Sequence, residues 1–378
     1  MSLSLPADPA GARSLTDVVP QSLAALSGRS DWFPPARGAI VFLVDGLGAR
    51  NLAARAGHAR FLSDAGGRKD VARTVFPSTT AAALTSLLTG TDPGEHGIVG
   101  YRVRVPDTGD VVNQLKGWET DGLDPRSWQR AEPILARESA EGRPCFVVSR
   151  HVYRDSGFTQ ATMRGAKFVG VADLVDRATT AAELVARHPG ALVYLYAPDL
   201  DVAGHKHGWE SEAWSAALER VDAAARALAE ALPADAGAVL TADHGMVDVP
   251  SHRHVLLGEG DPLLEGVAAI GGEPRMLQLY ADDGRADDVA ARWKTTESAR
   301  SWVLTRAEAI AAGMFGTVSA EVAPRIGDVV VAARSGIVYY DDRLADKAPQ
   351  RMVGQHGSWT DQERTVPLIR LGAFARPA

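Results

Sequence analysis

Four short runs of apolar and β-branched residues recur along the chain, and they constrain its fold more than any other feature. They are AIVFLVDG (39–46), CFVVS (145–149), ALVYLYAPD (191–199) and GAVLTADHG (237–245). Each run is short and continuously apolar, which is typical of strands buried on both faces. Segments with apolar residues three and four positions apart lie between them, at 173–188 and 211–232. This alternation predicts an α/β fold with a mostly parallel sheet and right-handed crossovers.

The segment after residue 250 has a different pattern, and it predicts a second, smaller unit. EPRMLQLYADD and GDVVVAAR are typical of strands, whereas RADDVAARWK and RAEAIAAGM are typical of helices. The length of 378 residues suits one large domain or two ordinary ones. We therefore expect an α/β core from residues 16–250 and 336–378, and a smaller cap or inserted subdomain from residues 251–335. Residues 1–15 are expected to be disordered, as chain termini often are.

Charge and hydropathy exclude several classes of function. The formal net charge is −7 and there is no long Lys/Arg tract, so a general nucleic-acid-binding surface is not indicated. No apolar stretch approaches the roughly 18 residues of a membrane span. The N-terminal stretch lacks the basic start and long apolar run of a signal peptide. These observations predict a cytoplasmic protein without membrane contact, and they leave its oligomeric state open.

Three of the predicted strands end in acidic residues. Asp45 follows the first strand, Asp199 and Asp201 follow the third, and Asp243 and His244 follow the fourth. In open α/β sheets the ligand lies beyond the carboxyl ends of the strands. The acids therefore predict one shared site, although a single Asp before Gly could equally cap the next helix.

The residue types gathered at these strand ends are those that bind a divalent metal. Asp201 and His205 have i, i+4 spacing, which places both side chains on one side of a helix or tight turn. His356 lies between two glycines, which allow a close backbone approach to a ligand. A solvated turn and a surface loop remain the alternatives for these two segments. Zinc accepts imidazole and carboxylate ligands without thiolate, and a pair of metals about 4 Å apart can clamp a phosphoryl group during in-line displacement.

The stretch VFPSTTAAALTSLLTG places Ser78, Thr79 and Thr80 in a row before a predicted helix. Such hydroxyls commonly cap a helix. A Thr hydroxyl bound to a metal ion would instead lose its proton near neutral pH and become a nucleophile.

These motifs together resemble a known family. Five motifs occur in the order found in the alkaline phosphatase superfamily: Asp45-Gly46, a hydroxyl followed by TG and HGI, Asp201-x3-His205, Asp243-His244 and GQHG. The pattern is most similar to its nucleotide pyrophosphatase/phosphodiesterase branch, and it extends from about Ile40 to Leu371. The resemblance implies a doubly wound sheet with helices on both faces, two divalent ions that are most simply Zn²⁺, and a covalent phospho-threonine intermediate. Ligand type alone would also permit manganese.

The resemblance also implies a role for each residue. One metal would be held by Asp201, His205 and His356, and the other by Asp45, Asp243, His244 and the nucleophile. In this superfamily the nucleophile stands ten positions before the glycine that follows its helix, here Gly90, which indicates Thr80. Ser78 or Thr79 would then cap the helix, and Thr79 is the alternative nucleophile because sequence-based helix starts shift by one or two residues.

One departure from the family pattern concerns the substrate. The branch often has a phosphate-binding Asn five residues after its HG histidine, where this chain has Tyr101. We expect either Tyr101 or Asn113 to contact the phosphate. The predicted activity is hydrolysis of a small phosphate ester such as a nucleotide, as a phosphodiesterase or nucleotide pyrophosphatase. The alternative is a phosphate monoesterase, which needs an extra positive group from Arg102, Arg150 or Arg154.

Overall fold

Seven strands form the main sheet within residues 5–375, the part of the chain that the computed structural model describes. Their spatial order is β2 (Val71–Arg73), β17 (Thr365–Gly372), β8 (Ala236–Thr241), β1 (Gly38–Val44), β7 (Leu192–Ala197), β5 (Cys145–Ser149) and β6 (Lys167–Gly170). The five strands from β8 to β6 are parallel, and β17 is antiparallel to both of its neighbours. The four apolar runs are four adjacent strands of this sheet, so the prediction of a mostly parallel sheet is confirmed.

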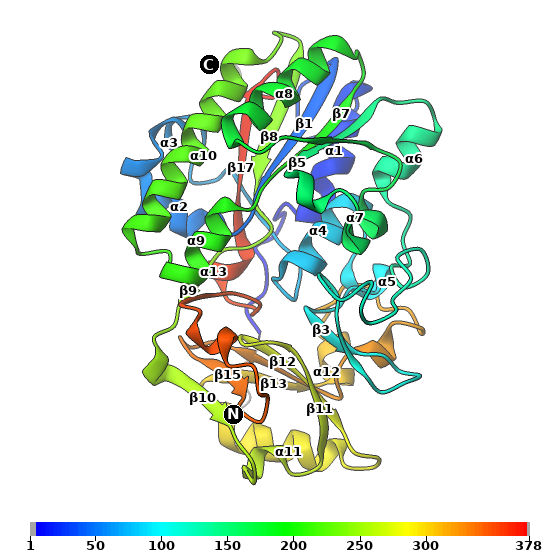
Figure 1. Ribbon diagram of the computed structural model, residues 1–378, viewed down its shortest axis with the longest axis vertical. Helices are drawn as coiled ribbons and strands as arrows, with labels where there is room; N and C mark the ends of the chain where they lie inside the picture. Colours follow the sequence, from blue (N-terminus) through cyan, green and yellow to red (C-terminus); the bar gives the residue numbers. More distant parts are fainter. Residues whose placement is uncertain (1–4, 376–378) are drawn as a thin grey trace.

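Helices cover both faces of the main sheet, as expected for a doubly wound fold. Helices α8 and α10 pack on one face, and α1 and α4 lie on the other (Figure 1). The helices are α1 (Val18–Leu26), α2 (Ala49–Ala54), α3 (Arg60–Ala65), α4 (Thr80–Thr89), α5 (Pro93–His96), α6 (Ile134–Ala140), α7 (Gly157–Thr162), α8 (Leu174–Arg187), α9 (Asp199–His207), α10 (Glu212–Ala231), α11 (Ala286–Glu297), α12 (Arg306–Ala311) and α13 (Asp361–Arg364).

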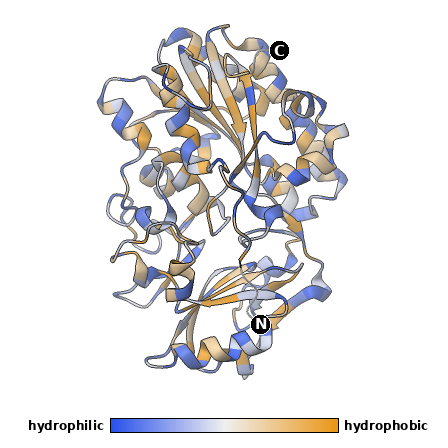
Figure 2. Ribbon diagram, turned by 180° about the vertical axis from the view of Figure 1, so that it is seen from behind, coloured by the Kyte–Doolittle hydropathy of each residue, from blue (hydrophilic) through white to orange (hydrophobic). Residues whose placement is uncertain are grey.

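The two longest helices begin where their sequences provide a cap. The Asp173 side chain accepts hydrogen bonds from the first-turn backbone of α8, and the Ser211 side chain accepts one from Trp214 N in α10. Both caps satisfy backbone donors that a helix start leaves without partners. The central strands β1 and β8 are buried along their whole length. Figure 2 shows that the strands of this sheet are largely hydrophobic. Burial of these strands holds in place the strand ends that carry the predicted site.

A second sheet lies beyond the carboxyl ends of the parallel strands (Figure 1). It is antiparallel, in the order β11 (Val267–Glu273), β12 (Met276–Ala281), β14 (Val329–Ala333) and β13 (Ser301–Thr305). Helix α11 packs against it, and Trp293 and Leu279 belong to a hydrophobic cluster separate from that of the main sheet. This sheet falls inside the segment predicted to form a cap, while the domain division itself remains a prediction.

Three short strand pairs form separate two-stranded sheets in the described part of the chain. They are β3 (Arg102–Arg104) with β4 (Val111–Asn113), β9 (Val247–Asp248) with β16 (Gly354–Gln355), and β10 (His254–Leu257) with β15 (Val338–Asp341).

The N-terminal segment contacts the core from residue 6 onward. Pro6 O accepts a hydrogen bond from Trp359, and the Asp8 carboxylate pairs with Arg364. The predicted disorder covers residues 1–15, of which residues 1–4 lie outside the described residues. Across residues 5–375, no helix is both long enough and apolar enough to cross a membrane.

Candidate active site

The predicted site residues meet at the carboxyl ends of three adjacent strands. Asp45 follows β1, Asp243 follows β8, and Asp201 lies in the first turn of α9, which begins just after β7. Gly46 makes the turn after β1 with a φ of +76°, and a Cβ at this position would lie 3.1 Å from the Asp201 Cα. The left-handed backbone conformation therefore favours a glycine, and the absence of a Cβ also eases the close approach of the two chain segments.

Asp45, Asp243 and His244 form one compact group, and all three are buried. The His244 Nε2 atom lies 3.4 Å from Asp45 Oδ1 and 3.3 Å from Asp243 Oδ2. The second carboxylate oxygen of Asp243 accepts hydrogen bonds from the backbone N–H groups of Gly46 and His244, at 3.0 and 3.1 Å. The fold therefore fixes one oxygen of Asp243 and directs the other toward the imidazole.

Asp201, His205 and His356 lie beside this group. The His205 Nε2 atom is 3.4 Å from Asp201 Oδ1, and the His356 Nε2 atom is 4.0 Å from the same oxygen. The imidazole of His356 also stacks on that of His244, with ring centroids 3.5 Å apart. The six Asp and His residues predicted as ligands are thus contiguous in the structure.

The hydrogen bonds of the three imidazoles determine which nitrogen faces the site. The Nδ1 atoms of His205, His244 and His356 lie 2.8, 3.2 and 2.9 Å from the backbone carbonyls of Gly354, Gly245 and Ser78. A carbonyl only accepts, so each Nδ1 carries the proton and each Nε2 presents a lone pair. The two lone pairs on His205 and His356 face each other across 3.2 Å. A cation between them would turn this repulsion into ligation.

The carboxylates support the same conclusion. One oxygen each of Asp45, Asp201 and Asp243 is buried without a hydrogen-bond partner among the described residues, and these oxygens are the ones that face the imidazoles. Burial, together with the charges of Asp243 and Asp201, raises the pKa of Asp45 well above its usual value. Burial and the neighbouring imidazoles His244 and His205 lower the pKa of His356 well below its usual value. Unpartnered carboxylate oxygens and imidazole lone pairs form a donor set that fits divalent metal ions.

Thr80 is the first residue of α4, and its hydroxyl reaches the cluster. The Thr80 Oγ1 atom lies 3.2 Å from His244 Nε2 and is buried. The helix ends at Gly90, which has a φ of +70°. Thr79 occupies the N-cap position, but its side chain makes no capping hydrogen bond. The Ser78 hydroxyl donates to the Ser358 carbonyl, so neither of the two expected caps acts through its side chain.

The structure gives less support to the two predicted phosphate contacts. The Asn113 side-chain oxygen accepts hydrogen bonds from Leu115 N and Lys116 N, so it is occupied in a local turn. Tyr101 is half-buried and precedes β3, which pairs with β4. Among the residues from 5 to 375, no hydrogen bond joins either residue to the Asp and His cluster, and their roles remain predictions.

Two residues at the site were not identified from the sequence. The Tyr196 hydroxyl, on β7, donates to Asp45 Oδ2. Glu273, at the end of β11, is buried and hydrogen-bonded to Thr79, and burial raises its pKa to about 8. A Cβ at Gly357, the residue after His356, would lie 2.6 Å from the Glu273 carboxyl carbon. Tyrosine in an otherwise aliphatic strand was a possible signal for Tyr196, because a buried hydroxyl usually needs a partner. Glu273 gave no such signal.

Of the three arginines considered for a monoester, two have side-chain partners outside the Asp and His cluster. Arg150 pairs with Asp199, the guanidinium of Arg154 lies over the Phe168 ring, and Arg102 is part of β3. Arg150 is therefore already neutralised by a carboxylate.

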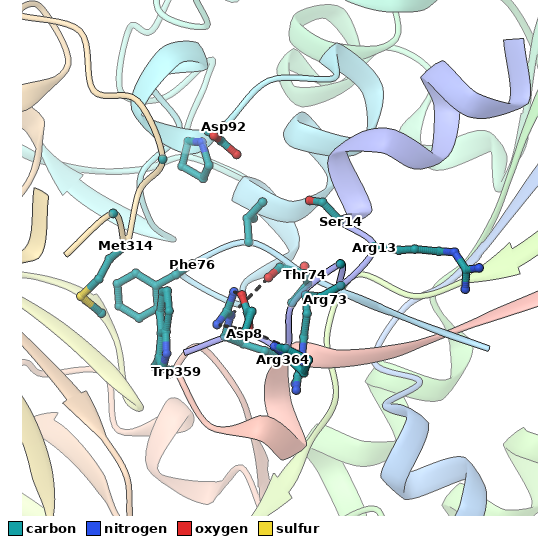
Figure 3. Close-up of a pocket in the computed structure, with 17 residues that line it drawn as sticks. Asp8, Arg13, Ser14, Arg73, Thr74, Phe76, Asp92, Met314, Trp359 and Arg364 are labelled. Atoms are coloured by element: carbon teal, nitrogen blue, oxygen red, sulfur yellow. Dashed lines mark hydrogen bonds and ion pairs between the residues drawn. The ribbon is translucent and has the colours of Figure 1, made fainter. Parts of the chain in front are cut away.

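A cavity of about 320 Å³ is lined by residues that do not belong to the Asp and His cluster (Figure 3). The Arg364 guanidinium, which lines this cavity, lies 3.7 Å from the centre of the Trp359 indole and pairs with the Asp8 carboxylate. Its charge is therefore already neutralised by a residue of the chain. Neither the six clustered residues nor Thr80 line the cavity. The candidate active site is consequently the strand-end cluster and not this cavity.

The doubly wound sheet and the Asp and His cluster at its strand ends define a protein of the alkaline phosphatase superfamily. Residues 39–359 match the type I phosphodiesterase / nucleotide pyrophosphatase family, and the chain belongs to this family.

Similar solved structures share this fold. Murine ectonucleotide pyrophosphatase / phosphodiesterase 5 superposes with a TM-score of 0.69 at 19% identity, over 88% of both chains. An inactive threonine-to-alanine variant of that protein has been solved in complex with AMP. Phosphonoacetate hydrolase from Sinorhizobium meliloti 1021, in complex with phosphonoformate, has a TM-score of 0.67 at 22% identity, over 89% of this chain and 91% of the hydrolase.

A curated relative is an uncharacterized pyrophosphatase/phosphodiesterase of Schizosaccharomyces pombe. It is 28% identical over 199 residues, which cover 48% of this chain. The match spans only 39% of the length of that relative.

Proposed function

We propose that this protein is a two-metal phosphodiesterase or nucleotide pyrophosphatase that acts through a phospho-threonine intermediate. The observation that carries the proposal is the cluster of unpartnered carboxylate oxygens and imidazole lone pairs with the Thr80 hydroxyl 3.2 Å from His244 Nε2. One ion would be held by Asp201, His205 and His356, and the other by Asp45, Asp243, His244 and Thr80. Two Zn²⁺ ions would supply the positive charge that favours an ionised hydroxyl and stabilises the leaving oxygen.

The remaining steps depend on residues of the chain. Thr80 lies at the start of a helix, where free N–H groups and the helix dipole favour a phosphate group. Its oxygen attacks phosphorus, the ester oxygen leaves, and water then hydrolyses the phospho-threonine.

A diester is favoured over a monoester because two candidate cations among the described residues are already paired with carboxylates. Arg150 is paired with Asp199, and Arg275, whose charge contributes to the low pKa of His356, is paired with Glu363. A nucleotide substrate is supported by the AMP complex of the murine neighbour. Hydrolysis of bis-p-nitrophenyl phosphate and a nucleotide p-nitrophenyl ester should exceed that of p-nitrophenyl phosphate. A large preference for the monoester would establish the alternative activity.

The decisive test compares two adjacent threonines. Thr80→Ala should abolish turnover while the metal content stays near two ions per chain, measured by mass spectrometry of the bound metals. Thr79→Ala removes the alternative nucleophile and should retain turnover. Acid quenching during turnover should trap phosphate on the peptide that contains Thr80. Full activity in Thr80→Ala would refute the assignment of the nucleophile, and a chain that takes up no metal would refute the proposed function as a whole.

A further inference from the structure

The hydrogen bond between Tyr196 and Asp45 divides the two oxygens of that carboxylate between different tasks. Strands β1 and β7 are parallel neighbours in which Leu43 pairs with Tyr196, so the phenol lies next to the residue that follows β1. The Tyr196 hydroxyl donates to Asp45 Oδ2. Asp45 Oδ1 has no hydrogen-bond partner among the described residues and lies 3.4 Å from His244 Nε2.

We infer that Tyr196 is a positioning residue that holds Asp45 as a one-oxygen metal ligand, with Oδ2 bound to the phenol and Oδ1 directed at the ion. The inference rests on the proposed function, because it concerns the metal held by Asp45, Asp243 and His244. Hydrogen-bonded partners of metal ligands fix the orientation of those ligands and contribute to metal affinity.

The surroundings of Tyr196 hold its phenol in place. Arg177, which is fully buried, donates to the Tyr196 carbonyl and pairs with Asp199. The ring of Tyr153 packs edge-on against the Tyr196 ring, with centroids 5.9 Å apart. The backbone and the ring are therefore both constrained, and the hydroxyl can act as a fixed donor.

Tyr194 provides a matched control in the same strand. It lies on the same face of β7 as Tyr196, and the two rings stack with centroids 6.3 Å apart. Its hydroxyl is also buried, but it has no hydrogen-bond partner in the described part of the chain. Removal of this hydroxyl should therefore leave Asp45 unchanged, whereas removal of the Tyr196 hydroxyl deprives Asp45 Oδ2 of its donor.

The test is a zinc titration of metal-free wild-type, Tyr196→Phe and Tyr194→Phe proteins in competition with a chromogenic chelator. Tyr196→Phe should weaken one of two zinc sites by about 10- to 100-fold and leave the other unchanged. Tyr194→Phe should keep both affinities within about threefold, since a buried hydroxyl without a partner contributes no bond. Equal zinc affinities in Tyr196→Phe and wild type would overturn the inference, as would an equal loss in Tyr194→Phe.

The affected site can be identified by adding His205→Ala to each chain. This substitution removes a ligand of the other ion, so the remaining high-affinity site is that of Asp45 and should still respond to Tyr196→Phe. A response confined to the other ion would contradict the inference. Failure of the wild-type chain to bind zinc would instead refute the proposed function, so the two outcomes are distinguishable.

A second measurement covers the case in which Tyr196→Phe does not fold. Wild-type protein labelled with 3-fluorotyrosine has more acidic phenols, which are stronger donors. Its affinity for one ion should change relative to unlabelled protein, and labelled Tyr194→Phe should show the same change. Unchanged affinity in both labelled chains would overturn the inference.

Discussion

Glu273 should make the stability of the metal-free protein depend on pH. The residue is 8% exposed, and one of its carboxyl oxygens is buried without a hydrogen-bond partner among the described residues. Burial raises the pKa of Glu273 from 4.5 to about 8. Below pH 4.5 the carboxyl is mostly protonated in both the folded and unfolded states, so it does not make the free energy of unfolding change with pH. As the pH rises from 4.5 to 8, the unfolded chain releases the proton and the folded chain retains it, so the free energy of unfolding falls.

The size of this effect follows from the two pKa values. One pKa unit corresponds to about 1.4 kcal/mol, so the contribution of Glu273 should decrease by about 3 kcal/mol between pH 5 and pH 8. Glu273→Gln replaces the protonated acid with a neutral side chain of the same shape that does not titrate. The difference in unfolding free energy between Glu273→Gln and wild type should therefore grow by about 3 kcal/mol over this range, in favour of the variant.

Urea unfolding followed by tryptophan fluorescence, with a chelator present, measures this difference at each pH. Glu259→Gln is the control, because Glu259 is exposed and its substitution should give a difference that does not grow with pH. Parallel pH profiles for Glu273→Gln and wild type would refute the reasoning, since they would mean that the buried carboxyl is already ionised at neutral pH.

Three further predictions concern metal, charge and backbone. Zinc at about 100 times its dissociation constant should stabilise the metal-free protein by about 2.7 kcal/mol, seen as a rise in melting temperature that a chelator reverses; an unchanged melting temperature would contradict a metal site. Arg275→Met should cost about 3–5 kcal/mol in urea unfolding because it leaves Glu363 buried without its cation. Arg285→Met is the control, because it removes an exposed ion pair with Glu265 and should lower the free energy of unfolding by at most about 1 kcal/mol. Equal losses of stability in the two variants would contradict this ranking. Gly357→Ala should lower the zinc content per chain, because Gly357 has a φ of +127° next to His356; unchanged zinc content would show that the loop tolerates a side chain.

Much of the core fold was predictable because its signals are local. Continuous apolar runs require burial on both faces, and they became adjacent strands of one sheet. Asp173 and Ser211 marked the starts of α8 and α10 because their side chains satisfy backbone N–H groups a few residues away. The sheet then brings Asp45 and Asp243 together, since the carboxyl ends of adjacent parallel strands share one edge.

Other features depend on contacts between distant segments. The sequence could not show that Thr79, which occupies the N-cap position, bonds Glu273 and does not cap α4, because that contact joins the helix to the second sheet. It also could not place Arg150, whose partner Asp199 belongs to the neighbouring strand end. For Thr79 a local capping rule competed with a tertiary contact, and the tertiary contact prevailed.

The sequence by itself therefore determined the strand and helix order, and the ordered Asp, His and Thr motifs that indicate the family. Only the tertiary structure decided which atoms face the site. The Nδ1 bonds of His205 and His356 to distant carbonyls select Nε2 as the free nitrogen, and Tyr196 rather than Tyr194 bonds Asp45. Residue type limits what chemistry a side chain can perform, whereas protonation and orientation are set by neighbours that the chain supplies from remote positions.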